Sequence, residues 1–134
     1  MDDDPNELLE FILAEARPVT KELVRDSRGI ETVSMVAIIA NPAAYHAKKV
    51  RFTGYLHLSF EHNAIYLHHE DLLNFISKNA LWIEMPEDMW LEKLALSNQY
   101  VICQGTLRAD LLGHMAMNSG TIHPVEVLEP RIVP

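Results

Sequence analysis

The chain has 134 residues, and its 19 acidic and 11 basic side chains give a net charge of −8. This length predicts a single domain, residues 1–134, and the acidic balance argues against a protein that grips nucleic-acid phosphates, since lysine and arginine make those contacts. The lone Cys103 excludes an internal disulfide. No apolar run approaches the ~18 residues of a membrane span, and the acidic N-terminus is unlike a signal peptide, so we expect a cytoplasmic protein without membrane contact.

Helical segments precede the predicted strands. Residues 5–16 carry apolar side chains at helical spacing and predict an amphipathic helix. Residues 17–32 have no clean period and indicate a connector, so we assign 1–33 to an N-terminal helical extension. Residues 34–40 predict a short apolar helix, and the following Asn41-Pro42 pair predicts a turn that reopens a helical turn through residues 43–45.

The stretch 48–59 is the clearest element. Apolar side chains recur at every second position from Val50 to Leu58, against polar ones on the other face, and this pattern is typical of a half-buried strand. Gly54 interrupts the apolar face and predicts a bulge or a sharp bend. After a polar turn, residues 63–69 predict the returning strand.

Three more strands and two helical pieces are expected. Residues 70–77 fit either a helical turn or a loop plugged into the fold, and 87–96 predict a helix with an acidic first turn. Gly105 predicts a bulge, and Pro124 marks the last strand as an edge or a strand margin. The three strands are expected at 80–85, 99–109 and 120–128.

This order of elements predicts a mostly β protein with a five-stranded OB-like barrel over residues 34–130. The expected helix lies between the third and fourth strands, as in an OB-fold. An SH3-like barrel or an α+β sandwich is the alternative, because strand order alone fixes closure weakly. Cys103 has apolar neighbours and is expected in the core.

The pieces VRFTGYLHLSFE, AIYLHHED, KNALWI, GHM and SGTI resemble a group of small, uncharacterised bacterial OB-fold-like proteins. The resemblance covers residues 35–128 and implies no reaction. Some small acidic proteins of this general kind are encoded beside toxins, so an immunity role is implied by loose analogy. The positions to which the resemblance points are Gly54, Tyr66, Asp71, Asn79, Trp82, Gly105, Gly113, His114 and Gly120.

Histidines and acids cluster at residues 68–71. A metal site would need His68 or His69, completed by Asp71 or the distant His114, because adjacent residues of a strand point to opposite faces. The sequence contains no HExxH or CxxC motif. We therefore interpret these residues as strand-end and turn residues, and we predict no cofactor.

The loop 110–120 contains His114, Met115 and Asn118. In an OB-fold this loop and the 57–63 turn flank the usual binding face, so we expect them to lie near each other. A tight turn that packs its methionines on the core is the simpler alternative.

Tyr55 and Tyr66 are expected on an outer sheet face, where tyrosines stack the bases of single-stranded nucleic acid. No lysine or arginine occurs between Arg51 and Lys78, so such a site has few positive charges for phosphate contacts. Trp82 and Trp90 are interpreted as packing residues.

The leading hypothesis is a non-catalytic binding module that engages another protein, such as a basic toxin domain that it neutralises. Single-stranded nucleic-acid binding is the first alternative, and a metal-dependent hydrolase using the 68–71 cluster and His114 is the second. No recognised nucleophile motif is present, so we predict no enzyme. The predicted binding residues are Tyr55, His57, Glu61, Tyr66, His69, Asp71, His114, Met115 and Asn118.

Overall fold

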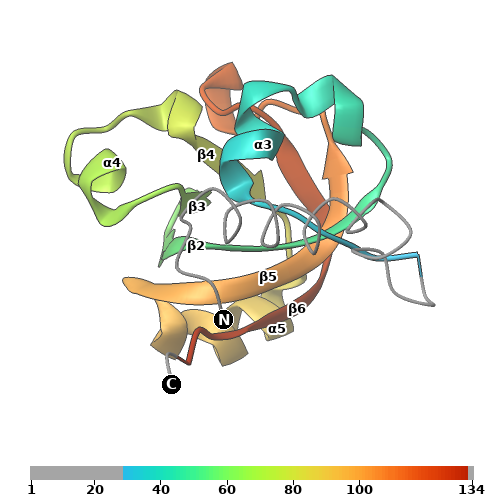
Figure 1. The fold of residues 1–134 in the computed structure, drawn as a ribbon. Helices are drawn as coiled ribbons and strands as arrows, with labels where there is room; N and C mark the ends of the chain where they lie inside the picture. The colour runs from blue at the N-terminus through green and yellow to red at the C-terminus, as the bar shows by residue number, and fades with distance from the viewer. Residues whose placement is uncertain (1–28, 133–134) are drawn as a thin grey trace, which may run out of the picture.

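The computed structural model describes residues 29–132 (Figure 1). The helix predicted at 5–16 therefore lies outside the described residues, as does most of the extension 1–33. The described part is mostly β and contains one six-stranded sheet. None of its helices is long and apolar enough to cross a membrane.

Short connections join the elements along the chain. The strands are β1 (Glu31–Thr32), β2 (Lys49–Ser59), β3 (His62–Tyr66), β4 (Ala80–Ile83), β5 (Gln99–Arg108) and β6 (Thr121–Pro130). The α-helices are α3 (Met35–Ala40), α4 (His69–Leu73) and α5 (Glu87–Lys93). Single 3-10 turns are η1 (Pro42–Tyr45), η2 (Ser77–Asn79), η3 (Leu94–Leu96) and η4 (His114–Ala116). The predicted helices at 34–40 and 87–96 are thus confirmed, the second ending in a 3-10 turn.

The sheet closes into a ring because β2 pairs with strands on both of its sides. The strand order is β1-β2-β3-β4-β6-β5, and β5 pairs again with β2. β2 is antiparallel to β5 over residues 49–56 and to β3 over residues 55–59. β4 and β6 run parallel, with Trp82 opposite Thr121. Five strands therefore form the ring, and β1 is added at the side of β2.

The strand irregularities predicted at Gly54 and Pro124 are not found in the structure as predicted. The register of β2 runs without a shift through Gly54, so the predicted bulge is wrong there. A Cβ at this glycine would lie 2.9 Å from both Met35 Sδ and the Tyr66 carbonyl oxygen, and closer still to Ile65. Gly54 instead allows a helix and a neighbouring strand to approach closely.

The bulge predicted at Gly105 is confirmed by register shifts on both sides of this residue. Pro124 lies inside β6 within the second shift, so its predicted place at a strand margin is wrong. Because the ladder with β5 is interrupted there, the missing proline N–H costs no ladder hydrogen bond.

The core fills the inside of the ring. The alternating side chains of β2, among them Val50, Phe52, Leu56 and Leu58, are buried as predicted. Met35 and Ile38 of α3 join this core, and Figure 1 shows α3 and α5 on opposite sides of the ring. Cys103 is fully buried, which confirms the prediction, and burial raises the pKa of its thiol.

A second, smaller cluster lies on the outer face of the ring, where α4 covers it. Tyr55, Ala64, Tyr66 and Ala80 are buried there against Leu72. The strand predicted at 63–69 therefore ends early, since His69 already begins α4. The helical turn predicted within 70–77 is confirmed, and the plugged loop is wrong because Leu73 and Phe75 are exposed.

β1 was not predicted, because residues 17–32 were interpreted as a connector. Glu31 and Thr32 pair in parallel with Val50 and Arg51 of β2. A strand of two residues is too short to show the alternation that identifies strands in a sequence.

Candidate functional site

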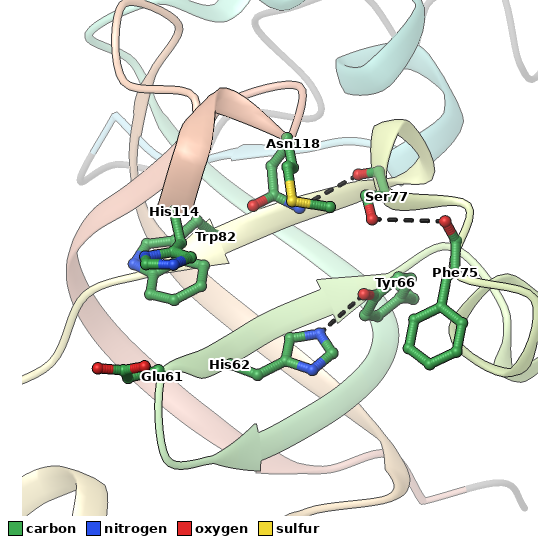
Figure 2. A pocket seen from close by; sticks show the side chains of 9 residues that line it. Glu61, His62, Tyr66, Phe75, Ser77, Trp82, His114 and Asn118 are labelled. Atoms are coloured by element: carbon green, nitrogen blue, oxygen red, sulfur yellow. Dashed lines mark hydrogen bonds between the residues drawn. The ribbon is translucent and has the colours of Figure 1, made fainter.

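A cavity of about 260 Å³ opens on the surface beside β3 and β4. We call it the central cavity, and Figure 2 shows its lining. Its walls come from the turn between β2 and β3, from β3 and β4, and from two long connections, one before β4 and one between β5 and β6. The lining residues are Glu61, His62, Tyr66, Phe75, Ser77, Trp82, His114, Met117 and Asn118.

Two further cavities adjoin the central one. A cavity of about 360 Å³ shares Trp82 and His114 with it and is also lined by residues 110–113 and Glu84. A cavity of about 390 Å³ shares Glu61 and is also lined by Phe60, Glu87 and Trp90, among others. The central cavity shares lining residues with each of the other two, and we call the three adjoining cavities together the groove.

The groove is acidic. Four carboxylates line it: Glu61, Glu84, Glu87 and Asp110. Among the residues that the structure places in its lining, none is lysine or arginine. Arg108 lies just behind Asp110 and donates two hydrogen bonds to it, at 2.9 and 3.1 Å. These bonds hold the pKa of Asp110 below its usual range.

Aromatic rings form two opposite walls of the central cavity. Trp82 and His114 stack with ring centroids 6.2 Å apart and ring planes at 27°. Figure 2 shows Phe75 and Tyr66 across the cavity from this pair. The Trp82 ring points outward because its strand neighbours Leu81 and Ile83 face the core. Its indole N–H donates to a Glu84 carboxylate oxygen at 2.6 Å, which fixes the ring.

A neutral polar pair lies between these walls. The Tyr66 hydroxyl and His62 Nε2 are 2.8 Å apart. Burial lowers the pKa of His62, and the nearby His57 lowers it further. Burial also raises the pKa of Tyr66, against a smaller opposite effect of a hydrogen bond with Ser77. Both side chains are therefore mainly uncharged near neutral pH.

The loops around the central cavity contain strained backbone. Glu61, Phe75, Met115 and Ala116 have positive φ angles of 59°, 53°, 57° and 57°. Non-glycine residues with positive φ are uncommon, and such strain concentrates at functional sites. Phe75 is also 75% exposed, so an aromatic ring stands in solvent beside the cavity.

The β5–β6 loop is held against the chain before β4. Lys78 Nζ donates to the carbonyl oxygens of Ala116 at 3.1 Å and of Asn118 at 2.9 Å. The Asn118 amide nitrogen donates in turn to the Ser77 carbonyl at 3.1 Å. These bonds fix the upper wall of the central cavity in Figure 2.

The α4 segment is fixed by a buried carboxylate. Asp71 accepts hydrogen bonds from the His68 backbone N–H at 2.9 Å and from the Asn79 amide at 3.1 Å. His69 stacks on Tyr55 with ring centroids 4.5 Å apart. Asp71 and His69 thus hold α4 on the sheet, outside the lining of the groove.

Four of the nine predicted binding residues line the central cavity: Glu61, Tyr66, His114 and Asn118. The predicted closeness of the 110–120 loop and the 57–63 turn is confirmed. Met115 is 78% exposed beside the cavity, and His57 lies behind His62, with ring centroids 4.7 Å apart. The other three, Tyr55, His69 and Asp71, belong to the packing of α4.

Sequence reasoning missed the remaining lining residues. Trp82 offered a signal, since it is a large apolar side chain on the outer face of a strand whose other face is buried. Phe75 offered none, because its exposure depends on how α4 ends. The missed residues are His62, Phe75, Ser77, Trp82 and Met117.

The proposed metal ligands do not come together. His68 Nδ1 lies 3.7 Å from Asp71 Oδ2, but His114 stacks on Trp82 instead. Across residues 29–132, no three His, Cys, Asp or Glu side chains form a group that could hold a metal ion. The two tyrosines expected to stack bases are also covered, with Tyr55 7% and Tyr66 1% exposed.

Comparisons of this chain with models of protein families, with curated proteins and with solved structures found no match.

Proposed function

We propose that the ring of strands is an OB-like barrel, and that the protein is a non-catalytic, cytoplasmic binding module whose groove engages a basic segment of another protein. The pairing order supports the OB-like assignment, since it closes five strands with a helix, α5, between the third and fourth. The groove crosses the face where the β2–β3 turn and the β5–β6 loop meet.

The lining of the groove carries the proposal. It combines four carboxylates with exposed apolar side chains and contains no lysine or arginine among the described residues. Burying these exposed apolar groups against a partner stabilises the complex. Complementary charge orients that partner and speeds its association. The exposed apolar side chains of the lining are Phe60, Phe75, Leu111, Leu112 and Met117.

The same lining disfavours the first alternative. Phosphate contacts are made by basic side chains, and base stacking needs accessible rings. The groove supplies rings without basic groups, and Tyr55 and Tyr66 lie under α4. A basic toxin domain is one partner of the favoured kind, and that identity remains a prediction from the resemblance.

Affinity capture from the native lysate tests the proposal when a groove variant is compared with a matched control. The groove variant carries Phe60→Ser and Phe75→Ser, which remove side chains that are 86% and 75% exposed. The control carries Val36→Ser and Ile132→Ser, which lie outside the groove lining and are 53% and 81% exposed.

We expect the unchanged protein and the control to retain one basic protein in equal amount, and the groove variant to lose it. Retention of nucleic acid in place of a protein would contradict the proposal. Equal retention of the partner by the groove variant would also contradict it.

A further inference from the structure

We propose that the central cavity is an aromatic cage for the guanidinium group of an arginine side chain on the basic partner. This inference rests on the proposed function and names the group that the groove recognises. It is drawn from the ring walls, the charge and the size of the cavity.

The walls suit a flat cation. Cations are attracted to the faces of aromatic rings, most strongly to tryptophan. The Trp82–His114 pair stands on one side of the central cavity, and the ring of Phe75, which is 75% exposed, stands on the other (Figure 2). Tyr66 lies on the same side as Phe75 but is only 1% exposed, so it offers no open ring face. A planar guanidinium stacks on such faces and is more weakly hydrated than an ammonium group.

The charge of the lining is also right for a cation. Glu61 is the only carboxylate among the residues that the structure places in the lining of the central cavity, and none of these residues is lysine or arginine. The Lys78 ammonium group is bonded to the backbone carbonyls of Ala116 and Asn118 in the loop wall and is not part of that lining. His62 and Tyr66 bond to each other and stay neutral near pH 7, so they do not repel a positive group. The cavity therefore offers one negative charge in a largely apolar surround.

Two oxygen acceptors are available for the fixed N–H groups of a guanidinium. Glu61 supplies a carboxylate, and Asn118 supplies an amide oxygen. The Asn118 nitrogen is turned toward Ser77 by its hydrogen bond, which leaves the oxygen on the Trp82 side (Figure 2). A Cβ added at Gly113 would lie 2.9 Å from Trp82 Cβ and closer still to Asn118 Oδ1, so this oxygen sits beside the base of the tryptophan.

The size favours a side chain over a free small molecule. At about 260 Å³ the central cavity falls below the roughly 300–1,000 Å³ typical of small-molecule sites. An arginine presented by a partner would fill it, while the flanking cavities would take the neighbouring residues of that partner.

The cage is tested by titrating the protein with blocked amino acids and monitoring binding through the NMR signal of the Trp82 indole N–H. The chain has two tryptophans, and Trp90, which lines the cavity of about 390 Å³, donates its indole N–H to Asn63 at 2.7 Å, so its signal reports separately on binding outside the central cavity. The probes are the Nα-acetyl amides of arginine, lysine, trimethyllysine and citrulline. Citrulline has nearly the shape of arginine without its charge.

We expect arginine amide to shift the Trp82 signal in a saturable way and to bind about tenfold more tightly than citrulline amide, because only arginine is a cation. Glu61→Gln should weaken arginine binding several-fold and leave citrulline binding unchanged. The matched control Glu129→Gln removes an exposed carboxylate outside the groove and should change neither.

Equal binding of arginine and citrulline would overturn the cage, as would tighter binding of lysine or trimethyllysine or the absence of a saturable shift. If the probes fail while the groove variant still loses its captured protein, the cage is wrong and the binding module stands. If the groove variant also keeps that protein, the proposed function itself is wrong.

Discussion

Phe75 occupies a backbone position that suits glycine. It follows the last turn of α4 with φ +53°, and its ring is 75% exposed. A left-handed conformation costs a non-glycine residue about 1–2 kcal/mol, whereas glycine costs about 0.5–1 kcal/mol in chain entropy. We therefore expect Phe75→Gly to raise the free energy of unfolding by about 0.5–1 kcal/mol in urea titrations while weakening partner binding.

Phe60→Gly is the matched control for this substitution. Phe60 is similarly exposed, at 86%, but is not among the residues with positive φ. Glycine there should lower the free energy of unfolding by roughly 0.5–1 kcal/mol. A loss of stability in both variants would show that the backbone at residue 75 is not strained.

His62 should make stability depend on pH. Burial and the neighbouring His57 lower the pKa of this side chain below 6.5. Between the lowered pKa and 6.5 the unfolded chain binds more protons than the folded one, so the free energy of unfolding falls as the pH drops through that window. His62→Gln should flatten this fall in unfolding titrations between about pH 7 and pH 5. An unchanged slope in the variant would contradict the assignment.

For single residues, the sequence predicted which face of the sheet a side chain occupies better than it predicted whether that side chain is exposed. Tyr55 and Tyr66 do lie on the outer face of the sheet, as their alternation with apolar residues implies, but α4 buries them. Trp82 was interpreted as packing and forms a wall of the cavity. Whether another segment of the chain covers an outward-facing side chain depends on tertiary packing. Local sequence patterns do not predict such burial.

Among the elements, α4 depends on a single carboxylate. Asp71 accepts from the His68 N–H and from the Asn79 amide, and it is 7% exposed. We expect Asp71→Ala to lower the free energy of unfolding by about 2 kcal/mol, because a helix cap and a buried hydrogen bond contribute about 1 kcal/mol each. Glu70→Ala, in the exposed first turn of the same helix, should cost less than about 0.5 kcal/mol in the same measurement. Equal costs would refute the role of Asp71.

The close approach of β2 to β3 and α3 depends on Gly54. A methyl group there would meet the Tyr66 carbonyl oxygen, which cannot move without breaking the sheet. Gly54→Ala should therefore cost about 2 kcal/mol of unfolding free energy by overpacking. At Gly120 the nearest atom to an added Cβ is the end of the Leu107 side chain, at 3.3 Å, so Gly120→Ala should cost much less. The idea fails if the two thermal midpoints shift equally.

Long elements with a clear period were the predictable ones. β2 and α5 were placed correctly because eleven and seven residues show alternation and helical spacing. β1 has two residues and was missed. The end of β3 was placed too late because Leu67 and His68 continue an apolar and aromatic run, while the cap made by Asp71 starts a helix instead.

For the whole molecule, the meeting of two distant loops was predictable only through the fold. The 110–120 loop and the 57–63 turn share no sequence signal, but the order of strands implied a closed sheet that brings them together. The acidity of the groove follows only partly from the net charge of −8, since it also requires that lysine and arginine lie elsewhere on the surface.

The central claim is that the groove binds a basic protein, and photo-crosslinking from residue 75 in living cells tests it most directly. A photoreactive phenylalanine analogue replaces Phe75, and the same analogue at Val36, exposed but outside the groove lining, is the control. We predict a covalent adduct with one basic protein from position 75, joined close to an arginine, and no such adduct from position 36. An adduct with nucleic acid, or the same protein adduct from both positions, would contradict the account.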